Sequence, residues 1–477
     1  MSKSVSFYLI TDAHFVSKQN WVDAKPINFR ERNDYIALKA SPEILDSFLE
    51  KIISDREVDT VVFLGDNVNN GDMNSHFEFR QRLERLTQAG KKVYVTYATH
   101  DYCGMGDDEN FFNAVRYTEH GTEPIEHMPK EKLFDFYSDF GPKQAKSVHT
   151  QSGSYSVMLC DKIMLIAIID NGNGRSFCGL DEGGVQWLES EIKSASEADI
   201  SVMLAVHHPV LPPWEVYRHF ADFEMYGGYK ELWQMMCENG VKVVFTGHTH
   251  FQNIKEYKDE NSNGFYDIST ISLVNAAGKM RKVEIDGDTR LCKVTSVGID
   301  KIKGIDTELS AYDYLYYLNF PGIWEKLIPL AAKDFKEFLL LAEGYLNEEK
   351  LKKHKVLVKL AFKKVQTLKL STAAKLGGAY RLLSKAEKSR AKDERFIDCV
   401  FEIMRHIFTG NGPFTPDTVE YKTVHSLVCK GDNLVRLFNI KSVKKIIPDG
   451  SSLSEIVEDF LYNNRTGDDD SITFSLK

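Results

Sequence analysis

The chain has 477 residues, of which 43% are hydrophobic and 27% are charged, and its formal net charge is -9 at pH 7. These values are ordinary for globular proteins and exclude a disordered, collagen-like or disulfide-scaffold chain. The acidic balance disfavours generic nucleic-acid binding, because the phosphate backbone repels most of such a surface. The 7 cysteines form no C-x-x-C pair, no signal peptide pattern opens the chain, and no apolar run could span a bilayer. We therefore expect a cytoplasmic protein with free thiols and no transmembrane segment.

The first part of the chain, to about residue 300, alternates short β-branched segments with amphipathic helical patterns. Strands are predicted at residues 5–11, 60–64, 92–98, 155–169 (two strands joined by a turn), 201–206 and 241–246. Helices are predicted at residues 77–88, 185–193 and 229–237, and another begins with Ser41 as N-cap and Pro42 as its first helical residue. Such alternation is typical of an α/β layered fold with a buried, mainly parallel sheet. After Gly247 the pattern changes to antiparallel strands, including residues 280–285 and 291–297.

From about residue 311 the strand patterns disappear and helical periodicity takes over. Helices are predicted at residues 327–346, 351–368, 373–386 and 396–408, and Ser452 with Glu455 forms a capping box before a last short helix. Residues 465–470 are polar and acidic, which is typical of a chain end without fixed structure. We predict an α/β domain over residues 1–303, a helical domain over 304–464 and a flexible tail over 465–477.

Polar side chains follow five of the predicted strands where each strand ends. The segments are Thr11-Asp12-Ala13-His14, Gly65-Asp66-Asn67-Val68-Asn69, Ala98-Thr99-His100-Asp101, Val206-His207-His208-Pro209 and Gly247-His248-Thr249-His250. Open α/β sheets bind ligands outside the carboxyl ends of their strands, so these residues are expected at one edge. A mixed set of Asp and His suits Zn, Mn or Fe better than Ca or Mg, which prefer oxygen ligands alone. An Asp on a tight turn flanked by Gly could bridge two such metals.

The ordered set D-x-H, G-D-x-x-N, x-x-H-D, H-H-P and G-H-T-H resembles the calcineurin-like metallophosphoesterase family over about residues 5–300. In detail it is similar to the branch that includes cyclic-nucleotide and glycerophosphodiester phosphodiesterases. The segment Gln186-Trp187-Leu188 resembles the Q-x-W-L segment of that branch. The resemblance implies a layered sandwich of mixed sheets flanked by helices, to which the C-terminal helical domain is an addition.

The resemblance also implies roles for individual residues. Asp12, His14 and His250 would bind one divalent transition metal, and Asp66 would bridge to a second metal held by His207 and His248. The metals would be Mn, Fe, Zn or Ni. The catalytic group would be His100, oriented from Asn69 and followed by Asp101.

Thr99 stands where the family has an Asn ligand of the second metal. A Thr hydroxyl is a weaker metal donor than an amide oxygen. We therefore expect Thr99 to hold the second metal loosely, through water, or only when substrate phosphate is present.

Aromatic and cationic residues occur in the segments expected to surround this edge. They include Trp21 and Tyr35 near the first motif, and Tyr217, Arg218, His219 and Tyr226 after the fourth. Loops at that end of a sheet form the rim where a substrate is chosen. We predict that the substrate is bound by Arg30, Arg32, Tyr102, His208 and Trp214.

The resemblance implies metal-dependent hydrolysis of a small phosphoester by a hydroxide that bridges two metals, with His100 assisting the leaving group. Asn69 stands where phosphatases of the family often have Asp, and this favours a phosphodiester. One alternative is a catalytically weak metal-binding scaffold, which Thr99 favours. Another is a nuclease that uses the lysine-rich segment 352–375, although that segment could also be a solvated helix or a surface for anionic lipid.

Overall fold

The computed structural model describes residues 4–102, 114–170, 178–217, 224–342, 346, 348–412, 414–437, 452–461 and 468–477. The chain divides into two compact units. The first consists of Met1–Pro213, Phe223–Leu318 and Thr466–Lys477, and the second consists of Trp214–Asp222 and Asn319–Arg465.

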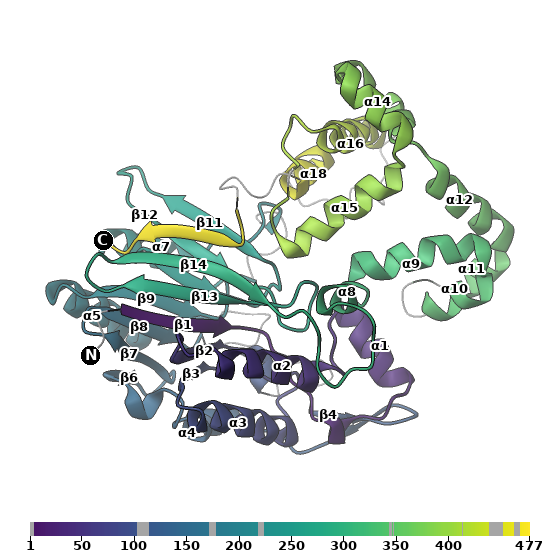
Figure 1. Cartoon of the computed structure of the whole chain (residues 1–477). Coiled ribbons are helices and arrows are strands. Elements are labelled where there is room, and N and C mark those ends of the chain that lie inside the picture. Colours follow the sequence, from purple (N-terminus) through teal and green to yellow (C-terminus); the bar gives the residue numbers. More distant parts are fainter. Residues whose placement is uncertain are drawn as a thin grey trace. The chain divides into compact units, whose positions relative to one another are not determined.

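The first unit contains two large mixed sheets among its described residues (Figure 1). One sheet has the order β15-β14-β13-β1-β2-β3, in which β1, β2 and β3 are parallel and the others antiparallel. Its strands are β1 (Ser4–Ile10), β2 (Thr60–Leu64), β3 (Lys92–Thr96), β13 (Lys279–Asp286), β14 (Leu291–Gly298) and β15 (Ser471–Ser475).

The second sheet has the order β11-β12-β10-β9-β8-β7-β6, with a parallel centre between β8 and β12. Its strands are β6 (Ser147–His149), β7 (Ser154–Cys160), β8 (Ile163–Ile168), β9 (Ser201–Val206), β10 (Val243–Thr246), β11 (Asn253–Lys258) and β12 (Gly264–Ser269). β7 and β8 confirm that residues 155–169 form two strands joined at Asp161-Lys162. β11 and β12 form a hairpin joined by the turn Asp259–Asn263, in which the Asn263 backbone N–H donates to the Asp259 carboxylate at 2.8 Å.

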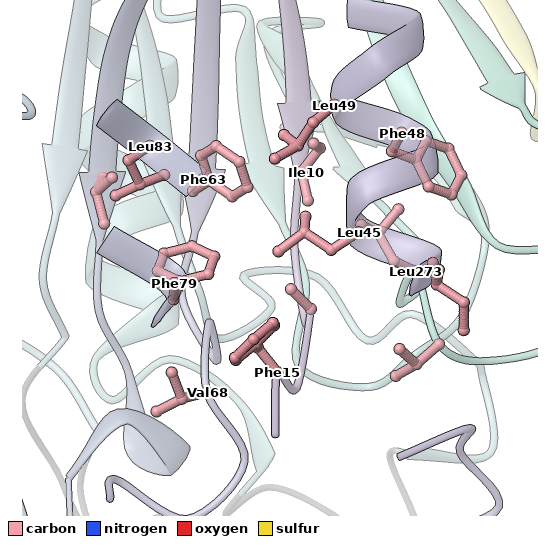
Figure 2. Packing of buried hydrophobic residues seen from close by; sticks show 14 of the residues in the cluster. Ile10, Phe15, Leu45, Phe48, Leu49, Phe63, Val68, Phe79, Leu83 and Leu273 are labelled. Carbon is pink, nitrogen blue, oxygen red and sulfur yellow. The ribbon is translucent and has the colours of Figure 1, made fainter. Parts of the chain in front are cut away.

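The two sheets pack face to face, and helices cover their outer faces. Between the sheets, Phe7 of β1 contacts Phe245 of β10 with 5.8 Å between ring centroids. The outer face of the first sheet is covered by α2 (Ser41–Ser54) and α3 (Met73–Gln88), and Figure 2 shows Phe63 of β2 against Phe79 of α3. The outer face of the second is covered by α5 (Glu182–Glu197) and α7 (Tyr229–Glu238). The fold is therefore the predicted α/β sandwich of mixed sheets flanked by helices.

The remaining elements of the first unit are short and lie mostly in the connections. They are η1 (Lys18–Asn20), α1 (Lys25–Asp34), η2 (Thr99–Asp101), β4 (Val115–Tyr117), β5 (Thr122–Pro124), α4 (Lys130–Phe136), η3 (Pro142–Gln144) and α8 (Ala311–Tyr316). Ser41 is the first residue of α2 rather than its N-cap, because its hydroxyl donates to the Leu38 carbonyl instead of accepting from the helix. Ala311 and Leu315 of α8 are buried in the core, so the first unit ends at Leu318 rather than at residue 303.

The prediction of a flexible tail over residues 465–477 is wrong for its described part. β15 pairs antiparallel with β14, and its alternate residue Phe474 is buried against Tyr266 with 4.9 Å between ring centroids. Just before β15, the backbone carbonyl of Asp469 accepts from the buried Arg281 guanidinium at 2.6 Å. The acidic composition of residues 465–470 led to the prediction of a flexible tail, although a short strand follows and forms the edge of the first sheet.

The second unit is helical and has its own core, which includes Leu370, Ala374 and Phe414. Its elements are α9 (Phe320–Lys333), α10 (Phe335–Leu341), α11 (Glu348–Lys353), α12 (Lys355–Thr367), α13 (Leu370–Gly377), η5 (Ala379–Leu382), α14 (Lys385–Asp393), α15 (Phe396–Thr409), α16 (Val419–Leu437) and α18 (Leu453–Leu461). The predicted helix 327–346 is interrupted at Asp334, whose carboxylate caps α10 by accepting from two backbone amides. The capping box of Ser452 and Glu455 is confirmed.

Within the described residues, no helix has the length and apolarity needed to cross a bilayer. The cysteines of the same residues are free, as predicted, and Cys103 lies outside them.

Candidate metal centre

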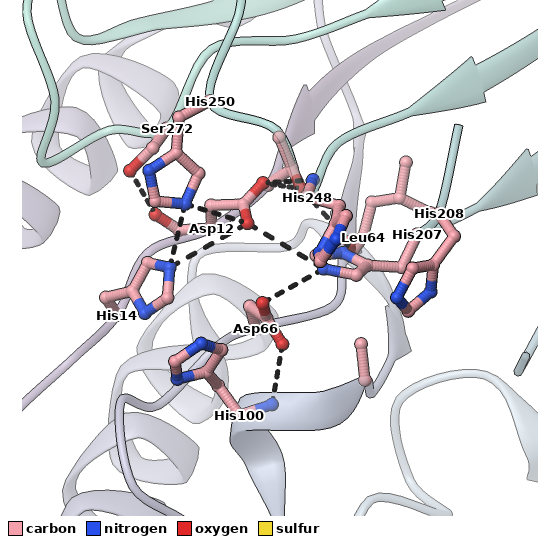
Figure 3. Close-up of polar contacts among 12 residues, drawn as sticks. Asp12, His14, Leu64, Asp66, His100, His207, His208, His248, His250 and Ser272 are labelled. Atoms are coloured by element: carbon pink, nitrogen blue, oxygen red, sulfur yellow. Dashed lines mark hydrogen bonds and ion pairs between the residues drawn. The ribbon is translucent and has the colours of Figure 1, made fainter. Parts of the chain in front are cut away.

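The strand ends named by the sequence converge at one edge of the sandwich (Figure 3). Asp12 and His14 follow β1, Asp66 follows β2, His207 follows β9, and the pair His248 and His250 follows β10. Three overlapping groups in this cluster have ligand atoms within 4.8 Å of one another: Asp12, His14, His250; His14, Asp66, His100; and Asp66, His207, His248. The first and third are the two ligand sets that the family resemblance implied.

The first set is compact. His14 Nε2 lies 3.0 Å from His250 Nε2, and the Asp12 Oδ1 atom lies 3.3 Å from His250 Nε2 and 3.8 Å from His14 Nε2. Three donor atoms at such spacing surround a volume that one cation can occupy.

The second set adjoins the first through His207. Its Nε2 atom lies 3.0 Å from Asp66 Oδ2 and 3.8 Å from Asp12 Oδ1. The carboxylates of Asp12 and Asp66 therefore both lie near the same imidazole.

Hydrogen bonds at the far sides of the rings determine which nitrogen faces the centre. His207 Nδ1 donates to the Leu64 carbonyl at 2.8 Å, and His14 Nδ1 donates to the Asn69 side-chain oxygen at 3.2 Å. Because a carbonyl oxygen only accepts, each Nδ1 carries the proton and each Nε2 keeps a lone pair in the neutral ring. The neutral imidazoles thus present their metal-binding atoms to the two carboxylates.

The buried polar atoms of this centre fit divalent cations. Asp12 Oδ1 and His207 Nε2 are buried and form no hydrogen bond with the described residues, which is costly unless a further partner binds. Burial favours protonated Asp12, but the charges of His207 and His250 outweigh it and hold the pKa of Asp12 below its usual value. Burial likewise lowers the pKa of His207, but Asp66 and Asp12 raise it to about 10. A divalent cation would replace the proton that His207 otherwise takes up.

The backbone around the centre is strained. Asp12, His14, Asp66, His248 and His250 all have positive φ, at 51°, 40°, 49°, 66° and 58°. L-residues rarely adopt this left-handed region, and such strain is found at functional sites where the surrounding structure enforces it. The turns after β1, β2 and β10 therefore hold the backbone in a strained conformation that directs these side chains toward the centre.

Glycines next to two of these turns are required by close packing. A Cβ atom at Gly65, where φ is +78°, would lie 2.7 Å from His207 Nδ1. A Cβ atom at Gly247 would overlap the Thr11 hydroxyl and crowd the Asp12 carboxylate. Both positions thus allow the strand ends to approach one another closely.

His100 lies beside the second carboxylate. Its backbone N–H donates to Asp66 Oδ1 at 2.8 Å, and its Nδ1 donates to the Asn69 backbone carbonyl at 2.7 Å. Its ring contacts that of His14 edge-on, with 4.6 Å between centroids. Burial lowers the pKa of His100, while Asp66 opposes that shift. Asn69 therefore orients His14 with its side chain and His100 with its backbone.

The predicted catalytic residue Asp101 is buried and turned toward the loops. Its carboxylate accepts from the backbone N–H groups of Val68 at 3.0 Å and Ala98 at 2.8 Å, and from the Asn67 amide at 3.2 Å. Burial and the nearby charge of Asp66 raise its pKa to about 8. These contacts tie the segment after β2 to that after β3, so Asp101 positions the loops that carry Asp66 and His100. Thr99 is buried at the start of η2, and its predicted role as a ligand stays a prediction.

The residues predicted to bind substrate are distributed differently. Arg30 forms an ion pair with Asp34 at 2.7 Å, and both charges act on the pKa of His100. Arg32 instead donates to the Asn28 carbonyl of its own helix at 3.0 Å. Tyr102 is buried in the core beneath the Lys130 ammonium group, which lies 4.7 Å from the ring centroid. The structure therefore brings Arg30 into electrostatic contact with His100, and the roles of Arg32 and Tyr102 in binding substrate stay predictions.

His208 and Trp214 are engaged in packing. His208 is fully buried, its Nδ1 lies 2.7 Å from Asp170 Oδ2, and its ring is 4.2 Å from that of His248. Trp214 belongs to the second unit, where it stacks on Phe460 at 5.2 Å and donates to the Asp459 carbonyl. Within the helical unit both the ring and the N–H of Trp214 are engaged, and its predicted role in binding substrate stays a prediction.

Other residues of the predicted rim are mainly structural. Tyr226 is buried, and Trp21 is half-buried against the core of the first unit. Arg218 and His219 lie outside the described residues.

Two contributors were missed by sequence reasoning. Glu224 places Oε2 2.6 Å from His248 Nε2, and Asp170 holds His208 beside His248. Asp170 directly follows a buried strand, which was an available signal. Glu224 has no such signal, because it follows no strand or motif and only tertiary proximity brings it to His248.

A family model described as calcineurin-like phosphoesterase matches residues 5–252, and no curated protein matches the chain. Among solved structures, a dimetal phosphatase from Danio rerio aligns at 12% identity over 62% of this chain and 96% of that chain, with a TM-score of 0.43. A purple acid phosphatase from yellow lupin (Lupinus luteus) seeds aligns at 12% identity over 62% of this chain and 52% of that chain, with a TM-score of 0.40. Because the family model spans more than half of the sequence, this chain belongs to the calcineurin-like phosphoesterases, a family of metal-dependent phosphoester hydrolases.

Proposed function

We propose that this chain hydrolyses a small phosphodiester with two divalent transition metals. Asp12, His14 and His250 would hold one metal, and Asp66, His207 and His248 would hold the other. The observation that carries the proposal is the position of His207 Nε2, which lies 3.0 Å from Asp66 and 3.8 Å from Asp12 without a hydrogen bond of its own among the described residues.

When bound, the two ions supply a hydroxide nucleophile at neutral pH and neutralise charge on the phosphoryl oxygens. The protein residues orient the reaction. His100 Nδ1 donates to the Asn69 carbonyl, so Nε2 is the atom that would donate a proton to the leaving oxygen, and it does so from the ring protonated on both nitrogens. Asp101 holds the loops on which Asp66 and His100 lie.

Two features favour a diester over a monoester. Position 69 carries a neutral amide, and its oxygen accepts from His14 where an aspartate would add a further negative charge. The guanidinium of Arg30 is already paired with Asp34, which reduces its capacity to neutralise a dianion. A diester carries a single negative charge and therefore needs less positive charge from the site than a monoester dianion does.

The test is an assay of the full chain after metal removal and reloading with Mn, Fe, Zn or Ni. We expect faster hydrolysis of a chromogenic phosphodiester than of the matching monoester. Cyclic nucleotides and single-stranded DNA are assayed in parallel. A preference for the monoester would contradict the diester assignment, cleavage of DNA alone would favour a nuclease, and no turnover with any metal would favour a scaffold.

Replacing His100 with Ala is expected to leave the metal content unchanged and to lower kcat by about 10²–10⁴-fold, the usual contribution of a general acid. The measurement pairs metal analysis with kcat for the phosphodiester. His120→Ala is the matched control, because His120 is an exposed imidazole of the same unit. A fully active His100→Ala enzyme would remove His100 from the mechanism.

A further inference from the structure

Helix α12 of the second unit packs through one face only. The ring of Phe362 lies 5.4 Å from that of Phe338, and Gln366 Nε2 donates to the Ile328 carbonyl at 2.7 Å. Lys355 also belongs to this side, since its ammonium group lies 5.3 Å from the Phe335 ring centroid. These contacts connect α12 to α9 and α10 and determine how it is turned.

The opposite side of α12 exposes aliphatic residues. Val356 is 70% exposed, Leu357 65%, Leu360 59% and Val365 40%. Leu360 is four residues after Val356 and three after Leu357, so these three side chains share one face of the helix, and Val365 lies at the edge of that face. Val356 and Leu357 have the largest exposed fractions of any large hydrophobic residue in the described chain. An apolar strip of this kind usually marks an interaction surface.

The same strip is strongly cationic. The segment from Leu351 to Lys375 contains eight lysines and no acidic residue. Lys363 and Lys364 are exposed next to the aliphatic residues, and neither forms an ion pair within the described structure. Lys352, in contrast, is paired with Glu348 at 2.5 Å. The occupant of this surface must therefore be both anionic and able to accept aliphatic side chains.

We propose that the α12 surface, formed by Val356, Leu357, Leu360, Lys363, Lys364 and Val365, binds the surface of an anionic lipid bilayer. Aliphatic side chains enter the boundary between headgroups and acyl chains, while neighbouring lysines meet lipid phosphates and carboxylates. A nucleic acid would use the lysines but leave the aliphatic residues in water. The chain would thus lie on a membrane as a peripheral protein, and this proposal is independent of the proposed reaction.

The test is co-sedimentation of the full chain with vesicles of phosphatidylcholine alone or of phosphatidylcholine with phosphatidylserine. We expect binding only to the vesicles with phosphatidylserine, and weaker binding at higher salt. Lys363→Gln/Lys364→Gln should weaken it by about 25-fold, since each lysine near such a surface contributes about fivefold. Leu357→Gln/Leu360→Gln should also abolish most of the binding. Gln has a helix propensity close to those of Leu and Lys, so α12 should stay folded, which circular dichroism checks.

The matched control is Leu382→Gln/Lys385→Gln, which removes an exposed leucine and an exposed lysine outside α12. This control should bind vesicles like the unsubstituted chain, and all variants should keep the same phosphodiester turnover. Equal binding to both vesicle types, or no binding, would overturn the proposal. So would full vesicle binding by the leucine variant, or binding to a single-stranded oligonucleotide in place of vesicles.

Discussion

At the scale of single residues, the centre depends on histidines whose Nδ1 atoms are already hydrogen-bonded to the protein. Leu64 accepts from His207 and Asn69 accepts from both His14 and His100, so the metal-facing atoms are left for a ligand. The clustering of the six candidate ligands could be predicted because each follows a buried strand within a recognisable motif. The contact of Glu224 with His248, and the hydrogen bonds of Asn69 to both His14 and His100, could not be predicted. They depend on which distant segments lie next to each other in the folded chain.

Gly65→Ala should damage the centre without touching a ligand. The added Cβ atom would lie 2.7 Å from His207 Nδ1 at a residue with φ of +78°, so it both strains the turn and displaces the imidazole. We expect lower metal content and a loss of stability of about 1–3 kcal/mol. The measurements are metal analysis and chemical unfolding.

Gly90→Ala is the matched control for the backbone effect, because Gly90 has a similar φ of +85° but has no atom within 4 Å of the added Cβ. The two variants should lose similar stability from strain, and only Gly65→Ala should lose metal. Equal metal content in both would show that crowding of His207 is unimportant.

At the scale of elements, the strands were predictable because buried parallel strands are apolar along their whole length. β2 and β9 occupy the predicted residues 60–64 and 201–206. Helices of the second unit were predicted as longer than they are, because periodicity continues through Asp334, where a capping side chain starts a new helix. β15 was missed because its inward residues Ile472 and Phe474, with Leu476 just after the strand, follow an acidic stretch.

Removing residues 468–477 should destabilise the first unit substantially. The truncation deletes β15 and takes the Asp469 carbonyl from the buried Arg281 guanidinium, whose burial already lowers its pKa to about 10. Arg281 keeps its hydrogen bonds to the Ser269 and Asn253 carbonyls but loses the negative charges of Asp469 and Asp470. Leaving a buried charge without its counter-charges costs about 3 kcal/mol or more. Denaturant unfolding measures the change, with Ser471→Thr/Ser475→Thr as a control that keeps the strand. A truncated chain as stable as the full one would mean that β15 contributes nothing.

The capping box of α14 should make the second unit sensitive to acid. Ser384 and Glu387 exchange hydrogen bonds, and these contacts, first from the Ser384 backbone and then from Lys422, lower the pKa of Glu387 from 4.5 to about 2. Because the pKa is lower in the folded state, this stabilisation is complete above pH 4.5 and is lost as the pH falls toward 2.

Ser384→Ala should cost about 1 kcal/mol at neutral pH, and Glu387→Gln, which cannot ionise, should flatten the pH dependence of unfolding between those limits. Ser389→Ala, which changes an exposed serine inside α14, is the control and should do neither. An unchanged acid profile in Glu387→Gln would show that other groups set the acid sensitivity.

At the scale of the whole molecule, the division into an α/β unit and a helical unit could be inferred from the change in periodicity near residue 311. The residue boundaries of the two units could not. The C-terminal strand belongs to the first unit, and the segment Trp214–Asp222, which lies between two parts of the first unit in the sequence, belongs to the second. These assignments have no local sequence signal, because the sequence around a tryptophan or a short strand does not show with which unit it packs. The assignment of Trp214 to the second unit could not be predicted for this reason, whereas the candidate metal ligands all lie in the first unit.

The central claim is that six side chains from four strand ends hold two metal ions, and anomalous diffraction from crystals loaded with Mn tests it most directly. We predict two peaks, one among Asp12, His14 and His250 and one among Asp66, His207 and His248, with the Asp66 carboxylate contacting both. A crystal with metal bound elsewhere, or with no peak at these residues, would contradict the account.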